Sequence, residues 1–202
     1  GEKQAGQPHR QAQAVMETNA RRLLEGYFSC HGLLLCNEDR DLPWLDSVGG
    51  DWNAVVALIE DRQVFWSKLW RGKVTYLSRA CYWQLKPYRQ RLSRVPPGSR
   101  EAYDLLADAG PLSTEELKRL LRFSGREYGK VMDPLFKELL VTAVERERTI
   151  ADNWSSFRWA TCQTWEAGST PEAPDAEKLR RLLIPPLTER QVQNLTRRGS
   201  CP

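Results

Sequence analysis

Histidine is scarce in this chain, and its cysteines form no recognisable pattern. His9 and His31 are the two histidines, and the five cysteines are irregularly spaced, with no Cys-x-x-Cys pair. A disulfide framework needs an even, patterned set of cysteines, and a zinc site needs spaced ligands. We therefore expect reduced thiols, as in cytoplasm, and neither a metal nor another cofactor. Acid–base catalysis by histidine would depend on His31 alone.

The sequence also lacks a long apolar run. Its apolar runs, such as residues 33–36, are far shorter than the ~20 residues of a membrane-spanning helix. The first 17 residues are polar and rich in Gln, unlike a secretory signal peptide. We expect a cytoplasmic protein without a membrane segment, and its 202 residues suffice to bury a core.

One stretch, residues 62–100, contains no Asp or Glu. It holds ten Lys or Arg, so in a chain of net charge +4 the remaining residues carry −6. Seven aromatic residues are interleaved with these cations. Cations bind phosphates, and aromatic faces stack on bases. A solvated basic face over an ordinary aromatic core would give the same pattern, so both interpretations stand at this point.

In the first half, capping and turn residues predict helices around one hairpin. Asp51 and Ser78 are suited to cap helices, and Arg71-Gly72 separates two runs rich in β-branched and aromatic residues, which predicts a hairpin. The expected elements are a mobile leader (1–17), a helix (18–29) inside a helical-looking run (23–36), a loop (36–50), a helix (52–62), a hairpin (64–70 and 73–78) and a helix (79–86).

The second half has clearer helix signals. Ser113-x-x-Glu116 and Ser124-x-x-Glu127 are capping boxes, each followed by apolar residues at helical spacing. Pro134 is expected to kink or restart the helix that it interrupts. The expected elements are a helix capped by Ser99 (to 109), helices opened by the two boxes, strands (139–150 and 157–166) and C-terminal helices (177–184 and 188–198).

Both halves thus give helices followed by a β-hairpin, which is the layout of a winged helix. Residues 93–99, SRVPPGS, contain two prolines and a glycine, as a linker would. The predicted fold is α+β and mainly helical, with tandem winged-helix modules, each a three-helix core followed by a hairpin wing. The expected parts are a leader (1–17), a first module (18–92), a linker (93–99), a second module (100–166) and a C-terminal linker with helices (167–202).

Three segments resemble a known family: KVTYLSRACYWQLKPY (73–88), the run 113–148, and NWSSFRWATCQTWE (153–166). They are similar to short bacterial proteins related to AlkZ, whose family comprises winged-helix DNA glycosylases that excise alkylated or crosslinked bases. The resemblance, over about 65–166, implies a tandem winged-helix fold and a link to DNA. The family's Gln-x-Gln or Gln-x-Asp motif is spelled only at 11–13 and 191–193. Neither place matches the family's, so no catalytic role is carried over.

We predict a DNA-binding protein without chemistry of its own, because a winged helix places its third helix in the major groove and its wing on the backbone. On the third helix Arg126, Lys130 and Lys137 are expected to face outward. Residues 101–166 have a net charge of −3, which favours the first module as the main DNA contact. The candidate DNA contacts are Lys68, Arg71, Lys73, Arg79, Lys86, Arg89, Arg91, Arg126, Lys130, Arg146, Arg148 and Arg158.

Charge alternates along the first strand of the second hairpin. A strand would place Arg146 and Arg148 on one face and Glu145 and Glu147 on the other. A basic face and an exposed strand laced with salt bridges both agree with this pattern.

Two alternatives to simple DNA binding remain open. A DNA glycosylase could use Asp152 or Asn153 to hold a water, although both are also common loop residues. Its tryptophans could stack on a base, but the even spacing of Phe157, Trp159 and Trp165 favours one core-facing side of a strand. A protein-interaction module, or a homodimer formed through 177–198, is the other alternative.

Overall fold

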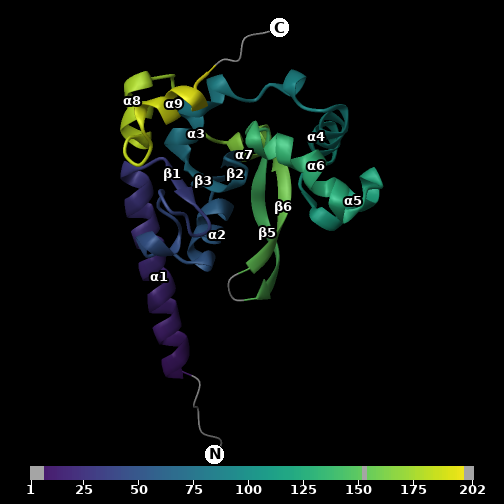
Figure 1. The fold of residues 1–202 in the computed structure, drawn as a ribbon. Coiled ribbons are helices and arrows are strands. Elements are labelled where there is room, and N and C mark those ends of the chain that lie inside the picture. Colours follow the sequence, from purple (N-terminus) through teal and green to yellow (C-terminus); the bar gives the residue numbers. More distant parts are fainter. Residues whose placement is uncertain (1–6, 152–153, 198–202) are drawn as a thin grey trace, which may run out of the picture.

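The protein is α+β and mainly helical, as predicted (Figure 1). The computed structural model describes residues 7–151 and 154–197. Its strands form two antiparallel three-stranded sheets, ordered β1-β3-β2 and β4-β6-β5. In each sheet the strand that comes last in the chain lies in the middle.

The first half of the chain is built around the predicted hairpin. Its elements are α1 (Gln7–Cys30), β1 (Leu33–Leu35), the 3-10 turn η1 (Asp46–Val48), α2 (Trp52–Glu60), β2 (Val64–Trp70), β3 (Lys73–Ser78), α3 (Arg79–Leu85), η2 (Lys86–Tyr88) and η3 (Leu92–Arg94). Asp51 and Ser78 cap α2 and α3, as predicted. Arg71 and Gly72 have φ of 51° and 71°, and positive φ at both positions matches the type I′ turn that hairpins prefer.

Helix α1 differs from the prediction at both ends. Residues 7–17, expected to be mobile, are helical, because Ala, Gln, Glu and Met favour a helix and Pro8 lies in the first turn, where its missing N–H costs little. The apolar run 23–36 is not one helix, since α1 ends at Cys30 and β1 follows. Between them a Cβ at Gly32 would lie 2.7 Å from the Cβ of Cys81, so only glycine allows this close approach.

The second half follows the predicted order with a short extra strand. Its elements are α4 (Pro97–Ala109), β4 (Leu112–Ser113), α5 (Thr114–Leu121), α6 (Gly125–Lys137), β5 (Val141–Ala151), β6 (Trp154–Thr161), α7 (Cys162–Glu166), α8 (Ala176–Leu183) and α9 (Glu189–Leu195). Both predicted capping boxes are present, at the starts of α5 and α6.

Two predictions for the second half were wrong, and one alternative of a third is excluded. Helix α4 begins at Pro97 rather than at Ser99, because the ring of a proline at the first helical position already has a helical φ. Helix α6 continues through Pro134, so the helix does not restart there. The returning strand ends at Thr161, which starts α7, so Trp165 lies on a helix and not on the strand face of Trp159.

The two halves share one core across the predicted linker 93–99. Helix α2 packs on β5 and helix α6 packs on β2, so each half covers the other half's hairpin. The Oγ1 of Thr142 in β5 accepts from the backbone N–H of Trp66 in β2 (3.0 Å) and donates to its carbonyl oxygen (2.8 Å). The Trp66 ring also meets Phe136 and Trp159, with centroids 4.8 Å apart in each pair. These contacts join the edges of the two sheets.

Both halves enter their hairpins through the same turn. Arg62 follows α2 and Leu139 follows α6, with φ of 59° and 56°. In each turn the next residue donates its N–H to the carbonyl five residues earlier, at 2.9 and 3.0 Å. Val64 and Val141 then begin β2 and β5. Because non-glycine residues rarely adopt a positive φ, the match indicates one local structure used twice.

The C-terminal helices α8 and α9 lie on the first half of the chain. The backbone N–H of Gly32 donates to the carbonyl of Leu182 in α8 at 2.7 Å, and α8 packs on α3. The buried apolar residues of this segment are Leu179, Leu182, Leu183, Leu187, Val192 and Leu195. The apolar side through which these helices were predicted to dimerise is therefore occupied within the chain.

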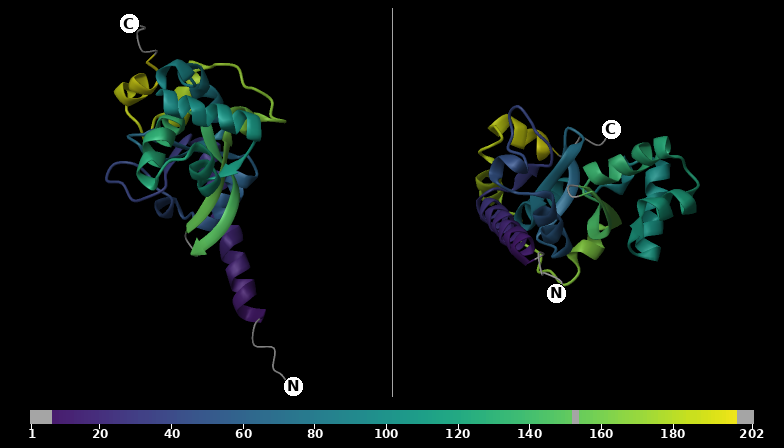
Figure 2. Two further views of the ribbon diagram at one scale, coloured as in Figure 1. Left: turned by 90° about the vertical axis from the view of Figure 1, so that its right-hand side faces the viewer. Right: turned by 90° about the horizontal axis from the view of Figure 1, so that it is seen from below.

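The N-terminal part of α1 projects beyond the rest of the molecule (Figures 1 and 2). Val15 and Met16 in this part are 69% and 70% exposed. The helix is nevertheless largely polar, with charged residues along its length. Across residues 7–151 and 154–197, no helix is at once long and apolar enough to cross a membrane.

Candidate nucleic-acid interface

Cations from both halves of the chain line up along α6 and the tip of the β2–β3 hairpin. We call this surface the cationic ridge, and it comprises Lys68, Arg71, Arg126, Lys130 and Lys137. The three α6 residues are spaced by four and seven positions, which places them on one side of the helix, and all three are exposed, as predicted. Lys68 reaches α6 from β2, with its Nζ 2.7 Å from Asp133 Oδ1.

The hairpin tip meets the C-terminal end of α6. A Cβ at Gly72 would lie 3.5 Å from Lys137 Cε and 3.8 Å from its Nζ. Arg71 beside it is exposed, and its guanidinium lies over the ring of Trp70, 5.1 Å from the centroid. The basic tip of the first half and the helix of the second half therefore form one surface.

The ridge keeps an excess of positive charge. Its carboxylates are Asp133, paired with Lys68, and Glu127, which accepts the backbone N–H of Ser124 at 2.6 Å. That hydrogen bond lowers the pKa of Glu127. Two carboxylates against five cations leave three positive charges on the ridge, whose helix α6 is about 20 Å long. This length matches the spacing of several phosphates along a duplex.

The cations predicted on and after α3 are held within the fold. Lys86 Nζ lies 2.6 Å from Glu166 Oε1. Arg79 and Arg89 donate to backbone carbonyl oxygens, at 3.0 and 3.1 Å. Burial lowers the pKa of Arg89, and Arg91 is half-buried. These residues lie by α3, α7 and the C-terminal helices and are not part of the ridge.

Lys73, at the start of β3, is tied to the loop that follows β1. Its Nζ lies 2.6 Å from Asp39 Oδ2. Asp39 also accepts the backbone N–H groups of Asp41 and Leu42, at 2.9 and 3.0 Å. The hydrogen bond from Lys73, followed by those from the backbone, lowers the pKa of Asp39 to about 2. The carboxylate therefore helps to hold the loop against the hairpin.

Replacing this carboxylate, Asp39→Asn, should lower stability above about pH 4, and the difference should shrink as the pH falls towards 2. A carboxyl whose folded pKa lies below its unfolded value of ~3.9 stabilises the fold above that value. This contribution is lost as the pH falls through the folded pKa. Melting temperatures of both proteins between pH 2 and 7 check this, and a difference that stays constant over the whole range would contradict it.

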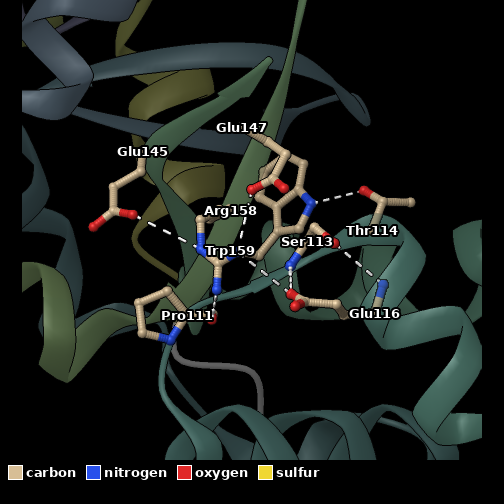
Figure 3. A network of polar contacts seen from close by, with 8 residues as sticks. All are labelled: Pro111, Ser113, Thr114, Glu116, Glu145, Glu147, Arg158 and Trp159. Atoms are coloured by element: carbon tan, nitrogen blue, oxygen red, sulfur yellow. Dashed lines mark hydrogen bonds and ion pairs between the residues drawn. The ribbon is translucent and has the colours of Figure 1, made fainter.

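Arg158, another predicted contact, is surrounded by carboxylates (Figure 3). Its guanidinium nitrogens lie 3.2 Å from Glu147, 3.5 Å from Glu116 and 3.8 Å from Glu145. It also donates to the carbonyl oxygen of Pro111 at 2.7 Å. Three carboxylates around one guanidinium make this side of the β5–β6 hairpin acidic, which disfavours a phosphate contact there.

Arg146 lies on the opposite side of the β5–β6 hairpin. It donates to Asn53 Oδ1 of α2 at 3.2 Å, whereas Glu145 and Glu147 face Arg158. The predicted alternation therefore holds for these residues. Arg148 belongs to β5, but its side chain lies outside the described part of the chain.

Of the groups considered for base excision, the described tryptophans Trp159 and Trp165 do not form one site. Asp152 and Asn153 lie outside the described residues. Trp159 and Trp165 are 6% and 0% exposed and belong to different elements. Within the described ranges, no group of three or more His, Cys, Asp or Glu could hold a metal ion. Base excision therefore stays a prediction.

A cavity of about 710 Å³ was not foreseen from the sequence. Four of its lining rings form a series from Trp52 through Phe157 and Trp159 to Trp66, with successive centroids 6.0, 5.7 and 4.8 Å apart. Other lining residues come from α1, the loop after β1 and the start of α5. Only the richness in tryptophan hinted at it, because its walls come from distant parts of the chain.

The chain was compared with known families, proteins and structures. No family model, no curated protein and no solved structure matches the chain. The ridge and the cavity are therefore the features from which function must be inferred.

Proposed function

We propose that this is a tandem winged-helix protein that binds duplex DNA through the cationic ridge. The observation that carries the proposal is the meeting of Arg71 and Gly72 at the hairpin tip with Lys137 at the end of α6. This contact combines cations that are 66 positions apart in the sequence into one surface. A surface of this kind gains affinity by releasing the counterions that surround DNA.

The winged-helix interpretation is supported by the repeated topology. Each half runs from a helix to a short strand, a helical segment, a second helix and a hairpin. The strand order is the same in both sheets, and both hairpins begin with the same turn. The resemblance to AlkZ-related proteins points to the same fold and to DNA.

Helix α6 is the better suited of the two equivalent helices to enter a groove. Its counterpart α2 is covered on most sides, with Ala54, Val55, Val56, Leu58 and Ile59 buried. Helix α6 instead exposes its cationic side along its length, with exposed residues at both ends. In this proposal α6 contacts the phosphates beside a major groove, and the tip of the β2–β3 hairpin contacts the neighbouring phosphates along the same duplex.

The proposal is tested by measuring affinity for a random-sequence duplex at salt concentrations between 50 and 300 mM, for example by fluorescence anisotropy. With all five ridge cations on phosphates, log Kd should rise with log salt with a slope of about 4.5. Failure to bind at about 50 mM salt, or a slope near zero, would reject the proposal.

A further inference from the structure

The aromatic cavity has the size of a small-molecule site, and four aromatic rings contribute to its mixed lining. Its volume of about 710 Å³ falls within the ~300–1,000 Å³ of typical ligand pockets. Trp52 at one end of the ring series is half-buried, and Trp66 at the other end is 6% exposed. The indole N–H of Trp159 already donates to Thr114 Oγ1 at 3.0 Å. The ring series therefore offers mainly aromatic surface.

The charged residues that line the cavity are all carboxylates among the residues described. They are Glu17 on α1, Asp46 in η1 and Asp51 at the start of α2. Glu17 and Asp46 are exposed, and Asp51 is fixed by accepting the backbone N–H of Ala54 at 2.8 Å. None of the described lining residues is Lys, Arg or His.

Nearby cations reduce this negative charge but do not cancel it. Arg146 lies behind the lining residue Asn53, to which it donates at 3.2 Å. Lys73 lines a smaller neighbouring cavity and is paired with Asp39. Among the described residues, the three lining carboxylates outnumber the guanidinium of Arg146, so the lining stays negative.

We propose that this cavity binds a small organic cation, a substituted ammonium with an apolar body. Aromatic faces attract such cations, and ammonium groups are strongly held where carboxylates neighbour the rings. A phosphodiester would instead meet Glu17 and Asp46 at the opening. The site is therefore separate from the cationic ridge, and the inference does not depend on DNA binding.

Comparing choline with 3,3-dimethylbutan-1-ol, an uncharged molecule of the same shape, tests whether the positive charge of the ligand contributes to binding. Titrations of the full chain, followed by tryptophan fluorescence against a sodium chloride blank, should show saturable binding of choline. The uncharged isostere should bind about tenfold more weakly, because it lacks the attraction to rings and carboxylates. Equal binding of the two compounds, or no choline binding at about 0.1 M, would overturn the proposal.

Substitutions that keep side-chain volume test the site assignment. Asp46→Asn with Glu17→Gln should weaken choline binding about tenfold, whereas Asp108→Asn, exposed on α4, should not change it. Unchanged melting temperatures would show that the variants fold. Adenosine is titrated in the same way as a competing ligand. If adenosine bound more tightly than choline, the cavity would be a nucleobase site and the proposal would be overturned.

Discussion

The double substitution Lys130→Gln with Lys137→Gln should weaken binding to duplex DNA about 100-fold at 0.1 M salt. Each phosphate contact contributes about 0.9 to the slope of log affinity against log salt, so at 0.1 M each is worth about tenfold. Both side chains are exposed on the same side of α6, and Lys137 also adjoins the hairpin tip. The salt slope should fall by about 1.8 in the same titration.

The matched control removes the same charge elsewhere. Arg181 on α8 and Arg190 on α9 are exposed and lie on the C-terminal helices, away from the ridge. Arg181→Gln with Arg190→Gln should weaken binding less than about threefold and leave the salt slope unchanged. Equal losses in the two double variants would mean that net charge, and not the ridge, governs binding.

The substitution Thr142→Val should lower the free energy of unfolding by about 2–6 kcal/mol. The hydroxyl of Thr142 is the partner of both the N–H and the carbonyl of Trp66, and both residues are buried. Valine has nearly the same shape but leaves both backbone groups without a partner, and each such group costs about 1–3 kcal/mol. Urea unfolding measures the difference.

Two control variants, Thr142→Ser and Thr170→Val, test whether the loss of stability comes from the Thr142 hydroxyl. Serine keeps the hydroxyl and loses one methyl group, so the serine variant should lose about 1 kcal/mol. Thr170 is exposed, and its change to valine should alter stability by less than about 0.5 kcal/mol. If Thr142→Val cost no more than Thr142→Ser, the bridge between the sheets would not contribute to stability.

Local signals in the sequence predicted most of the secondary structure. Asp51, Ser78, Ser113 and Ser124 each start the helix expected of them, because a capping residue acts within three positions of itself. The Arg71-Gly72 turn was predicted for the same reason. Helix α1 was underestimated because its first turns have no apolar stripe, although their residues favour a helix.

The ridge and the cavity could be predicted only in part, because they depend on how distant segments pack. The outward side of α6 follows from helical spacing. The pairing of Lys68 with Asp133 and the packing of α2 on β5 do not, since both arise where the two halves meet. The sequence therefore predicted cations in the first half and a helix in the second, but not that they share a surface.

The sharing of helices between the two hairpins has a consequence for how the chain reaches its native state. Helix α2 contacts both β2 and β5, and helix α6 contacts both β5 and β2. Residues near 93–99 thus separate two fragments that complete each other's core. We therefore expect both hairpins to form together, in a single cooperative transition.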